Sequence, residues 1–404
     1  MKIKAAFSLA VLLFLSATIF GQAPTKWRGP QANGIYPDKG LLKVWPADGP
    51  QVLWTFDGLG QGFSTPVFTR DYIYVSGMSV DTGFIYKLTY AGKLVWRKTY
   101  GTEFKKQWPG TRACPVIVGD KLYILSGTGH LCCMSSVDGK PIWSKEIFSD
   151  FDGRQITWAV NETVVVDGDK LYCTPGGMKN GVVALNRNTG ALIWSCEAMS
   201  NKSGYSTPLL IDLPKRKLLV TMMAENIVGI DRETGKMLWN YGWTNQYAVH
   251  ANTPLYYDKG LFCFSGYGQG CIKFSLSDDG NITKEWANKN MDSKIGGAVL
   301  VNGYIYGSGD MANPAWQCVD WKTGEEKYAS KEIGKGNVIY ADGMLYCYSD
   351  KGELALAEAN PAGFKVVSKT KVTQGTEYHW AHLAINNGVL YLRHGNTLIA
   401  YKIK

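Results

Sequence analysis

The stretch ALNRNTGALIW, residues 184–194, decides the fold because the chain repeats it. Residues 229–239 read GIDRETGKMLW, with the same glycine turn and the same closing tryptophan. Looser copies of the turn end in a bulky side chain at Trp96, Trp143, Trp286, Tyr328 and Val367. The copies follow one another every ~45 residues, and self-similarity at such a period is typical of repeat architectures.

A second element lies upstream of each turn. Residues 115–127 (PVIVGDKLYILSG) and 164–176 (VVVDGDKLYCTPG) combine β-branched and aromatic residues around a turn-forming Gly-Asp or Asp-Gly pair. Such pairs between β-rich runs predict tight hairpins. Each unit is therefore predicted to run strand A, hairpin, strand B, loop, strand C, glycine turn, strand D. Four strands per ~45 residues indicate one blade of a β-propeller.

Seven such units are complete, and they begin near residues 65, 114, 163, 207, 253, 297 and 337. The eighth begins at His382 and contains strands A to C before the chain stops. Residues 50–58 (PQVLWTFDG) form a strand with Trp54 but with no strands A to C before it. We therefore expect an all-β, eight-bladed propeller of four-stranded antiparallel blades, whose last blade is closed by the N-terminal strand. The recurring tryptophan is interpreted as a wedge between neighbouring blades.

The pattern A-x-(D/N)-x-x-T-G-x-x-x-W in residues 184–194, matched in residues 229–239 except at Gly229, resembles the docking motif of the pyrroloquinoline quinone (PQQ) repeat family. That family includes quinoprotein alcohol dehydrogenases and outer-membrane assembly lipoproteins of the BamB kind. The resemblance covers residues 50–404. It implies the propeller fold and is much less specific for activity, because members of one fold carry different functions.

The N-terminus precedes the repeats in two parts. Lys2 and Lys4 are followed by an apolar run to Phe20 and then by Gly21, which is the pattern of a cleavable signal peptide over residues 1–21. A retained anchor is the alternative, although the run is shorter than the ~20 residues that cross a bilayer. Residues 22–49 are rich in glycine and proline and are expected to lie along the surface as an arm, ahead of the propeller at residues 50–404. The prediction is a secreted or periplasmic protein without a lipobox cysteine and without stable membrane insertion.

Composition excludes some partners and leaves others open. The formal charge is +9, but the basic residues are scattered rather than clustered, so nucleic-acid binding is not expected. The nine cysteines are an odd number, so at least one thiol is free, and most lie in strand patterns where cysteine packs as a small apolar residue. No spacing of cysteine and histidine predicts a metal site, and a monomer is expected.

One end of the propeller gathers the candidate functional residues. The loops from strand D to the next strand A, and those from strand B to strand C, share one face, here called the axial face. All five histidines fall in these loops, at His130, His250, His379, His382 and His394. The start of each strand A should ring the mouth of the central channel. The candidate ligand-binding residues there are Arg112, Glu162, Asn252, Lys294, Trp380 and His382.

The residue types in this ring favour an anionic or sugar-like ligand. Arginine grips carboxylates and phosphates bidentately, and tryptophan stacks on flat or sugar-like faces. An ion pair between Arg112 and Glu162 is an equally simple reading of those two residues. Candidate catalytic residues are His250, His379 and Tyr205, whose types occur in propeller polysaccharide lyases. The H-x-x-H of His379 and His382 does not place both rings on one side of a strand, so metal binding there is not favoured.

The family resemblance raises a cofactor as well. The quinoprotein dehydrogenases hold PQQ and Ca²⁺ with an acidic residue, an asparagine and a catalytic aspartate, under a disulfide between adjacent cysteines. In this sequence only Glu162 with Asn161 or Asn252 matches those ligand types, and Cys132 and Cys133 are adjacent within a predicted strand C. Neighbours on a strand point to opposite faces, so two packed thiols are expected there. PQQ with calcium is thus an open but not favoured cofactor.

The resulting prediction is a binding protein that recognises an anionic or carbohydrate ligand, or a protein partner, on its axial face. The alternative is an enzyme using the same face, either a polysaccharide lyase or hydrolase or a PQQ-dependent dehydrogenase.

Overall fold

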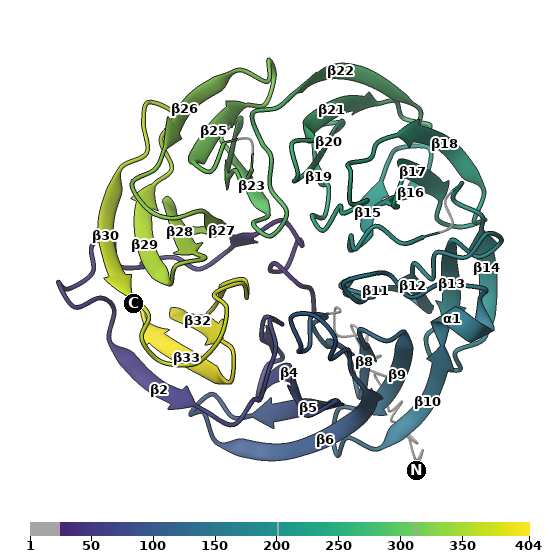
Figure 1. Ribbon diagram of the computed structural model, residues 1–404, viewed down its shortest axis with the longest axis horizontal. Coiled ribbons are helices and arrows are strands. Elements are labelled where there is room, and N and C mark those ends of the chain that lie inside the picture. The colour runs from purple at the N-terminus through teal and green to yellow at the C-terminus, as the bar shows by residue number, and fades with distance from the viewer. Residues whose placement is uncertain (1–24, 200–201, 312) are drawn as a thin grey trace, which may run out of the picture.

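The structure is a computed structural model, and it describes residues 25–199, 202–311 and 313–404. The predicted signal peptide, residues 1–21, lies outside the described residues. Eight sheets stand around a central axis, so the predicted eight-bladed propeller is confirmed (Figure 1). The first strand of each repeat lies on the inner side of its blade, as the positions of β11, β15, β19, β23 and β27 in Figure 1 show.

The first four blades contain sixteen strands in chain order. Blade 1 consists of β3 (Val67–Phe68), β4 (Ile73–Ser79), β5 (Thr82–Leu88) and β6 (Leu94–Thr102). Blade 2 consists of β7 (Val116–Val118), β8 (Lys121–Leu125), β9 (His130–Ser135) and β10 (Pro141–Glu146), followed by the short helix α1 (Ile147–Asp150). Blade 3 consists of β11 (Val165–Asp167), β12 (Lys170–Cys173), β13 (Val182–Asn186) and β14 (Leu192–Cys196). Blade 4 consists of β15 (Leu209–Asp212), β16 (Lys217–Met222), β17 (Asn226–Asp231) and β18 (Met237–Gly242).

The remaining blades complete the ring. Blade 5 consists of β19 (Leu255–Tyr257), β20 (Gly260–Ser265), β21 (Gly270–Leu276) and β22 (Ile282–Asn288). Blade 6 consists of β23 (Ala298–Val301), β24 (Tyr304–Ser308), β25 (Trp316–Asp320) and β26 (Glu326–Ser330). Blade 7 consists of β27 (Gly336–Ala341), β28 (Met344–Ser349), β29 (Glu353–Glu358) and β30 (Val366–Lys371). Blade 8 consists of β31 (Ala384–Asn386), β32 (Val389–His394), β33 (Thr397–Lys402) and the N-terminal β2 (Val52–Phe56).

The ring is closed by the N-terminal strand, as predicted. Strand β2 pairs antiparallel with β33, with Thr55 opposite Ile399. Arg393 of β32 reinforces the closure, because its guanidinium donates to Ser64 Oγ (2.7 Å) and Ser76 O (2.5 Å) of blade 1. The two ends of the propeller are therefore joined by backbone pairing and by a fully buried arginine.

The recurring tryptophans lie between blades. Trp194 of blade 3 donates from its indole N–H to the carbonyl oxygen of Arg232 in blade 4, at 3.1 Å. Its ring lies against Gly235 of the same turn, where a Cβ atom would stand 2.7 Å from the indole. Equivalent indole-to-carbonyl bonds are made by Trp54, Trp96, Trp143, Trp239 and Trp286. The predicted wedge is confirmed, and the recurring spacing of turn and tryptophan has a packing cause.

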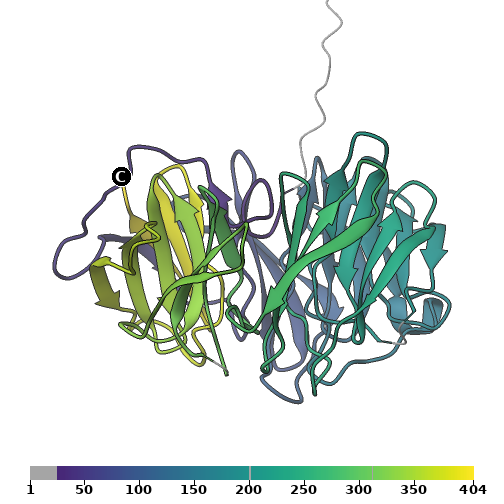
Figure 2. The same ribbon diagram turned by 90° about the horizontal axis from the view of Figure 1, so that it is seen from above.

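The N-terminal arm differs from the prediction. It does not simply lie along the surface, because Arg28, Tyr36, Leu41 and Trp45 are buried. A short strand, β1 (Ile35–Tyr36), pairs parallel with β27 of blade 7. In Figure 1 the purple chain runs inward beside β27 to the centre of the ring, and Figure 2 shows it on the same side of the disc as the C-terminus. The arm enters the channel because burial of these side chains stabilises it there.

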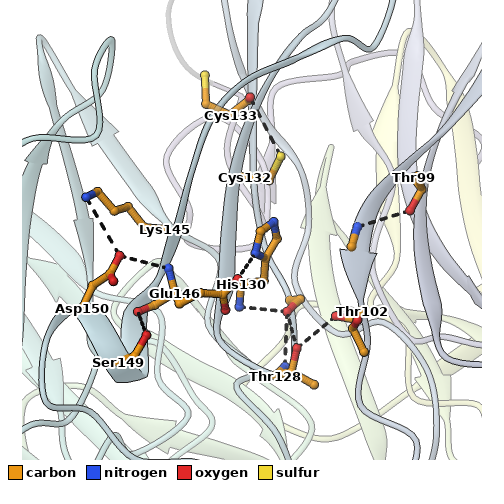
Figure 3. A network of polar contacts seen from close by, with 12 residues as sticks. Thr99, Thr102, Thr128, His130, Cys132, Cys133, Lys145, Glu146, Ser149 and Asp150 are labelled. Carbon is orange, nitrogen blue, oxygen red and sulfur yellow. Dashed lines mark hydrogen bonds and ion pairs between the residues drawn. The ribbon is translucent and has the colours of Figure 1, made fainter.

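The adjacent cysteines behave as the strand pattern predicts. Cys132 packs with the core between blades 1 and 2, whereas Cys133 packs with the core on the other side of blade 2. Figure 3 shows the two sulfur atoms pointing apart on β9. All nine cysteines are buried free thiols. Within the described residues, none of the helices has the length and apolar character that a membrane span requires.

Candidate functional site

A cavity of about 320 Å³ opens on the axial face at the centre of the ring. It is lined by D–A loops of every blade and by two B–C loops, the arrangement expected from the sequence. Its lining includes Arg112, Tyr205, Asn252, Lys294, Trp380 and His382 from the predicted set. The volume is at the small end of the roughly 300–1,000 Å³ range of ligand pockets.

Two neighbouring aromatic clusters, one from the loops before blades 8, 1 and 2 and one from the loops before blades 3 and 4, line the cavity. In the first, Trp380 lies between Phe63 and Trp108, with ring centroids 5.2 Å and 6.0 Å away. In the second, Trp158 lies 6.2 Å from Tyr205. Together the walls present flat apolar faces with polar edges, a surface suited to rings that carry hydroxyl or carboxyl groups.

Several of these aromatic residues have strained backbones. Trp108, Tyr205 and Tyr267 line the cavity and adopt left-handed conformations, with φ of 48°, 75° and 63°. Bulky residues avoid this region, and such outliers gather at ligand-binding sites. The surrounding structure thus holds three wall residues in unfavourable backbone conformations.

A charged cluster lies on the side of the cavity formed by blades 6 and 7. Asp310 is 3% exposed and pairs with both Lys294 (3.1 Å, Nζ to Oδ2) and Lys335. Lys294 also lies over the Tyr267 ring, with Nζ 4.8 Å from the centroid. A second carboxylate, Asp350, lines the cavity, and burial raises its pKa. The two lysines share the buried carboxylate of Asp310, and only with Arg112 in the same cavity do the cations outnumber the two carboxylates.

Arg112 lines the cavity, as expected, and its guanidinium bonds three backbone carbonyls. Its Nη1 donates to Gly110 O (2.7 Å), and its Nη2 donates to Trp108 O (2.8 Å) and Gln107 O (3.2 Å). The alternative interpretation, an ion pair with Glu162, is not realised, because the Glu162 carboxyl group bonds Thr174. Burial lowers the pKa of Arg112, and nearby Glu103 partly offsets this effect. The guanidinium lines the cavity and at the same time holds the loop that carries Trp108.

Glu162 does not face the cavity, so the sequence interpretation of it as the carboxylate of the ring is wrong. Its carboxyl group is fully buried and accepts from Thr174 N (2.8 Å) and from Thr174 Oγ1. Burial raises the pKa of Glu162 to about 7, against the lowering effect of the Thr174 bonds. The carboxylate role near the lysines belongs to Asp310 instead. Its place in the long B–C loop of blade 6, outside the D–A positions, explains why the repeat alignment missed it.

The histidines are distributed behind and beside the cavity. His250 is fully buried and its Nε2 bonds Ala224 O at 3.2 Å, while burial lowers its pKa to about 4. His379 stacks on His394 with centroids 3.7 Å apart and bonds the Tyr348 hydroxyl at 2.6 Å. Burial, with His394 close by, lowers the pKa of His379 to about 4. Neither His250 nor His379 lines the cavity.

His382 alone of the H-x-x-H pair reaches the cavity. Arg28 Nη1 lies 3.1 Å from its Nδ1, and its Nε2 lies 3.1 Å from Ile295 O. Since an arginine can only donate, Nδ1 is the acceptor and Nε2 carries the proton. Burial and the nearby Arg28 charge lower the pKa of His382 to about 3. The H-x-x-H residues therefore have separate partners, and His382 is a neutral wall residue.

Asn252 combines a cavity position with a structural role. Its Nδ2 donates to Ser293 O (2.5 Å) and its Oδ1 accepts from Gly297 N (3.1 Å), which ties blade 5 to blade 6.

Trp27 also lines the cavity and was not predicted. It belongs to the arm, whose composition gave no signal of a channel contact.

The cavity does not fit a calcium-bound quinone of the dehydrogenase type. Such a site needs carboxylate and amide oxygens converging on one cation. Here Asp310 is neutralised by two lysines, Glu162 is enclosed by Thr174, and both polar atoms of the Asn252 side chain are engaged. Among the residues that the structure describes, no group of three or more His, Cys, Asp or Glu side chains converges as a metal site. Cys132 and Cys133 are buried in separate cores away from the cavity.

His130 lies on the same face but outside the cavity. Its Nδ1 is 2.5 Å from Glu146 Oε1, and the pair adjoins α1 at the outer side of blade 2 (Figure 3). It joins β9 to β10 and is separate from the axial site.

Comparison with known proteins identifies the family. The family model described as outer membrane protein assembly factor BamB matches residues 81–330. BamB from Shewanella oneidensis is 23% identical over 215 residues, which cover 50% of this chain and 49% of BamB. The quinoprotein alcohol dehydrogenase PedH of Pseudomonas putida is 25% identical over 155 residues, covering 36% of this chain and 24% of PedH. The matched region thus spans about a quarter of the dehydrogenase and about half of BamB.

The solved structures agree on the fold. The crystal structure of BamB from Moraxella catarrhalis superposes with a TM-score of 0.63 at 14% identity, and the match covers 88% of this chain and 100% of that one. The chain belongs to the PQQ-like β-propeller family, through the family model described as outer membrane protein assembly factor BamB.

Proposed function

We propose that this protein is a secreted or periplasmic binding protein whose axial cavity holds a small molecule with a carboxylate on a six-membered ring. The observation that carries the proposal is the pairing of two aromatic walls with the Lys294–Asp310–Lys335 cluster in one cavity. The walls accept the ring, and the three cations Arg112, Lys294 and Lys335 outnumber the carboxylates of the cavity and attract the acid group.

Two buried arginines beside the channel support a negative charge on the ligand. Arg28 and Arg393 are almost fully buried, and their hydrogen bonds go to neutral groups: His382 and backbone carbonyls for Arg28, and Ser64 and backbone carbonyls for Arg393. Neither belongs to an ion pair among the described residues. Burying a charge without a counter-charge costs several kcal/mol, and although neither guanidinium lines the cavity, both add to the positive potential around the channel.

A thermal-shift screen tests the proposal and distinguishes a sugar acid from an aromatic acid as the ligand. A ligand that binds only the folded state raises the unfolding temperature according to its concentration and affinity. The screen pairs glucuronate with glucose, and 4-hydroxybenzoate with 4-hydroxybenzyl alcohol. We expect an acid to stabilise the protein and its neutral counterpart to have little effect. Equal shifts for acid and neutral partners, or none in either pair, would refute the proposal.

A protein partner is the second candidate, because apolar side chains are exposed around the cavity mouth. Trp108, Tyr247, Met311 and Tyr378 are 41%, 47%, 56% and 45% exposed and all lie in axial loops. Exposed apolar groups on one face are typical of interaction sites. The test is whether Met311→Asp weakens a copurifying complex while leaving acid binding unchanged.

The enzyme alternative has less support. His250 and His379 lie outside the cavity, and His382 has both ring nitrogens engaged. Of the three candidate catalytic residues, only Tyr205 lines the cavity, and burial raises its pKa to about 12. A lyase would form an unsaturated uronate, so new ultraviolet absorbance on incubation with polyuronates would favour this alternative over simple binding.

A further inference from the structure

The N-terminal arm crosses the end of the channel opposite the axial face. At one side, Thr25 N donates to Ile117 O in blade 2 (3.0 Å), and Ile117 N donates to Thr25 Oγ1 (2.8 Å). At the other side, β1 pairs with β27 of blade 7, with Ile35 opposite Tyr340. Between these anchors Arg28 bonds Ala298 O of blade 6 at 2.6 Å. The arm therefore ties three separate blades together across the axis.

The arm also separates two cavities. Trp27 lines the axial cavity of about 320 Å³. Thr25, Lys26, Arg28, Gly29 and Tyr36 line a second cavity of about 220 Å³ on the other side. Without the arm, the axial cavity would be one end of a through-channel. Trp27 gives it a base, and the Trp27 ring packs edge-on against His382 with centroids 5.1 Å apart.

Arg28 is held in a closely fitted cradle. A Cβ atom on Gly297 would stand 2.1 Å from its Nη1, and one on Gly34 would stand 2.4 Å from its Nη2. The two glycines thus leave room for a guanidinium in a site that offers it only neutral acceptors. From there Arg28 fixes the ring of His382, a residue of the cavity wall.

We infer that the arm completes the ligand site, with Trp27 as a ligand-contacting residue at the base and Arg28 as a positioning residue that orients His382. The inference rests on the proposed function and adds a specificity determinant to it. If the ligand rests on Trp27, then binding stabilises the docked arm, and by reciprocity a docked arm raises the affinity for the ligand. The ring end of the acid would meet Trp27 and His382, since the lysines lie on the side wall.

Hydrogen exchange of the wild-type chain measures this coupling directly. Amide exchange in peptides covering residues 27–37 is compared with and without saturating acid from the thermal-shift screen. We expect at least about threefold slower exchange in the arm, because ligand binding lowers the population of undocked arm. Peptides covering β6 of the outer ring serve as the internal control and should not change. Equal exchange in the arm with and without bound acid would overturn the coupling.

Two substitutions test the residues. Trp27→Ala should weaken acid binding at least about tenfold, as measured by calorimetry. Lys26→Ala replaces the neighbouring, exposed side chain and should leave binding unchanged. In Arg28→Met, the ¹⁵N shift of His382 Nδ1 should move toward that of an acceptor without a hydrogen bond, because Nδ1 loses its donor while Ile295 O still accepts from Nε2–H; an unchanged Nδ1 shift would contradict the positioning role. Circular dichroism and the unfolding temperature show that each variant is folded.

The outcomes separate the two proposals. Acid binding by the wild type with unchanged affinity in folded Trp27→Ala overturns this inference and leaves the proposed function standing. Absence of acid binding by the wild type overturns both.

Discussion

Arg28 Nη1 lies 3.1 Å from His382 Nδ1, although His382 follows more than 350 residues later in the chain. This contact joins the N-terminal arm to the part of the cavity wall that precedes the last blade. The contact links ring closure, the blind end of the channel and the binding site. It explains why a segment without strand pattern is ordered: its side chains occupy the axis that the eight blades leave open.

The lysine pair should set the affinity for the acid. Lys335→Met is expected to weaken acid binding about tenfold. It should also reduce the salt dependence of binding, because dissolved ions screen a charge that faces the open cavity. Asp310→Asn should do the opposite and strengthen binding, since it frees both lysines. Calorimetry at two salt concentrations measures both effects.

Lys327→Met is the matched control for the lysine prediction. Lys327 is similarly exposed but pairs with Glu325 at the outer edge of blade 6. An equal loss of affinity in both lysine variants would show that overall charge, rather than the cavity cluster, attracts the ligand.

Arg112 should act through geometry as much as through charge. Arg112→Lys keeps the positive charge but cannot serve three carbonyl acceptors from a planar fork. We expect the loop carrying Trp108 to loosen, with faster amide exchange over residues 105–111 and an approximately fivefold or greater loss of affinity. Wild-type affinity and loop exchange in Arg112→Lys would mean that the charge alone matters.

Glu162 predicts an unusual pH dependence. Its folded pKa of about 7 lies above the ordinary 4.5, so between these values the folded state binds more protons than the unfolded state. The stability contributed by the protonated carboxyl is full below pH 4.5 and is lost as the pH rises through 7. Glu162→Gln removes this loss, which is on the order of 3 kcal/mol for the fully buried group. Relative to the wild type, the variant should gain unfolding temperature between pH 4.5 and pH 8.

The surface variant Glu325→Gln provides the comparison for Glu162→Gln. It should show the same small offset at both pH values. A constant offset for Glu162→Gln as well would show that the carboxyl titrates normally.

Blade docking can be tested with two glycines. Gly235 has φ of +76° and a Cβ there would lie 2.7 Å from the Trp194 ring, whereas Gly119 has φ of +61° and open space around it. Gly119→Ala should cost about 1 kcal/mol from backbone strain alone. Gly235→Ala should cost clearly more, because it also displaces the indole between blades 3 and 4. Equal losses in chemical denaturation would argue against the tryptophan as a wedge.

The repeat made the fold predictable. The turn at Gly190 and Trp194 determines strand spacing, and the orphan strand around Trp54 identifies the closure, because both depend on local pattern. The same alignment predicted which residues surround the channel, and Arg112, Asn252, Lys294, Trp380 and His382 do line the cavity.

The side-chain directions were not predictable in the same way. Glu162 and Asn161 are adjacent, yet only Asn161 faces the cavity. Asp310 lies in a long loop and Trp27 in the arm. Neither segment has a sequence periodicity from which the position of its residues in space could be predicted. Long-range contacts such as Arg28 with His382 leave no local signature, so the base of the site came only from the structure.

Calorimetric titration of the wild-type protein with glucuronate and 4-hydroxybenzoate, beside their neutral counterparts, tests the central claim most directly. We expect saturable binding of one acid at one molecule per chain, with much weaker binding of its neutral partner. No binding of either acid, or equal binding of acid and neutral partner, would contradict it.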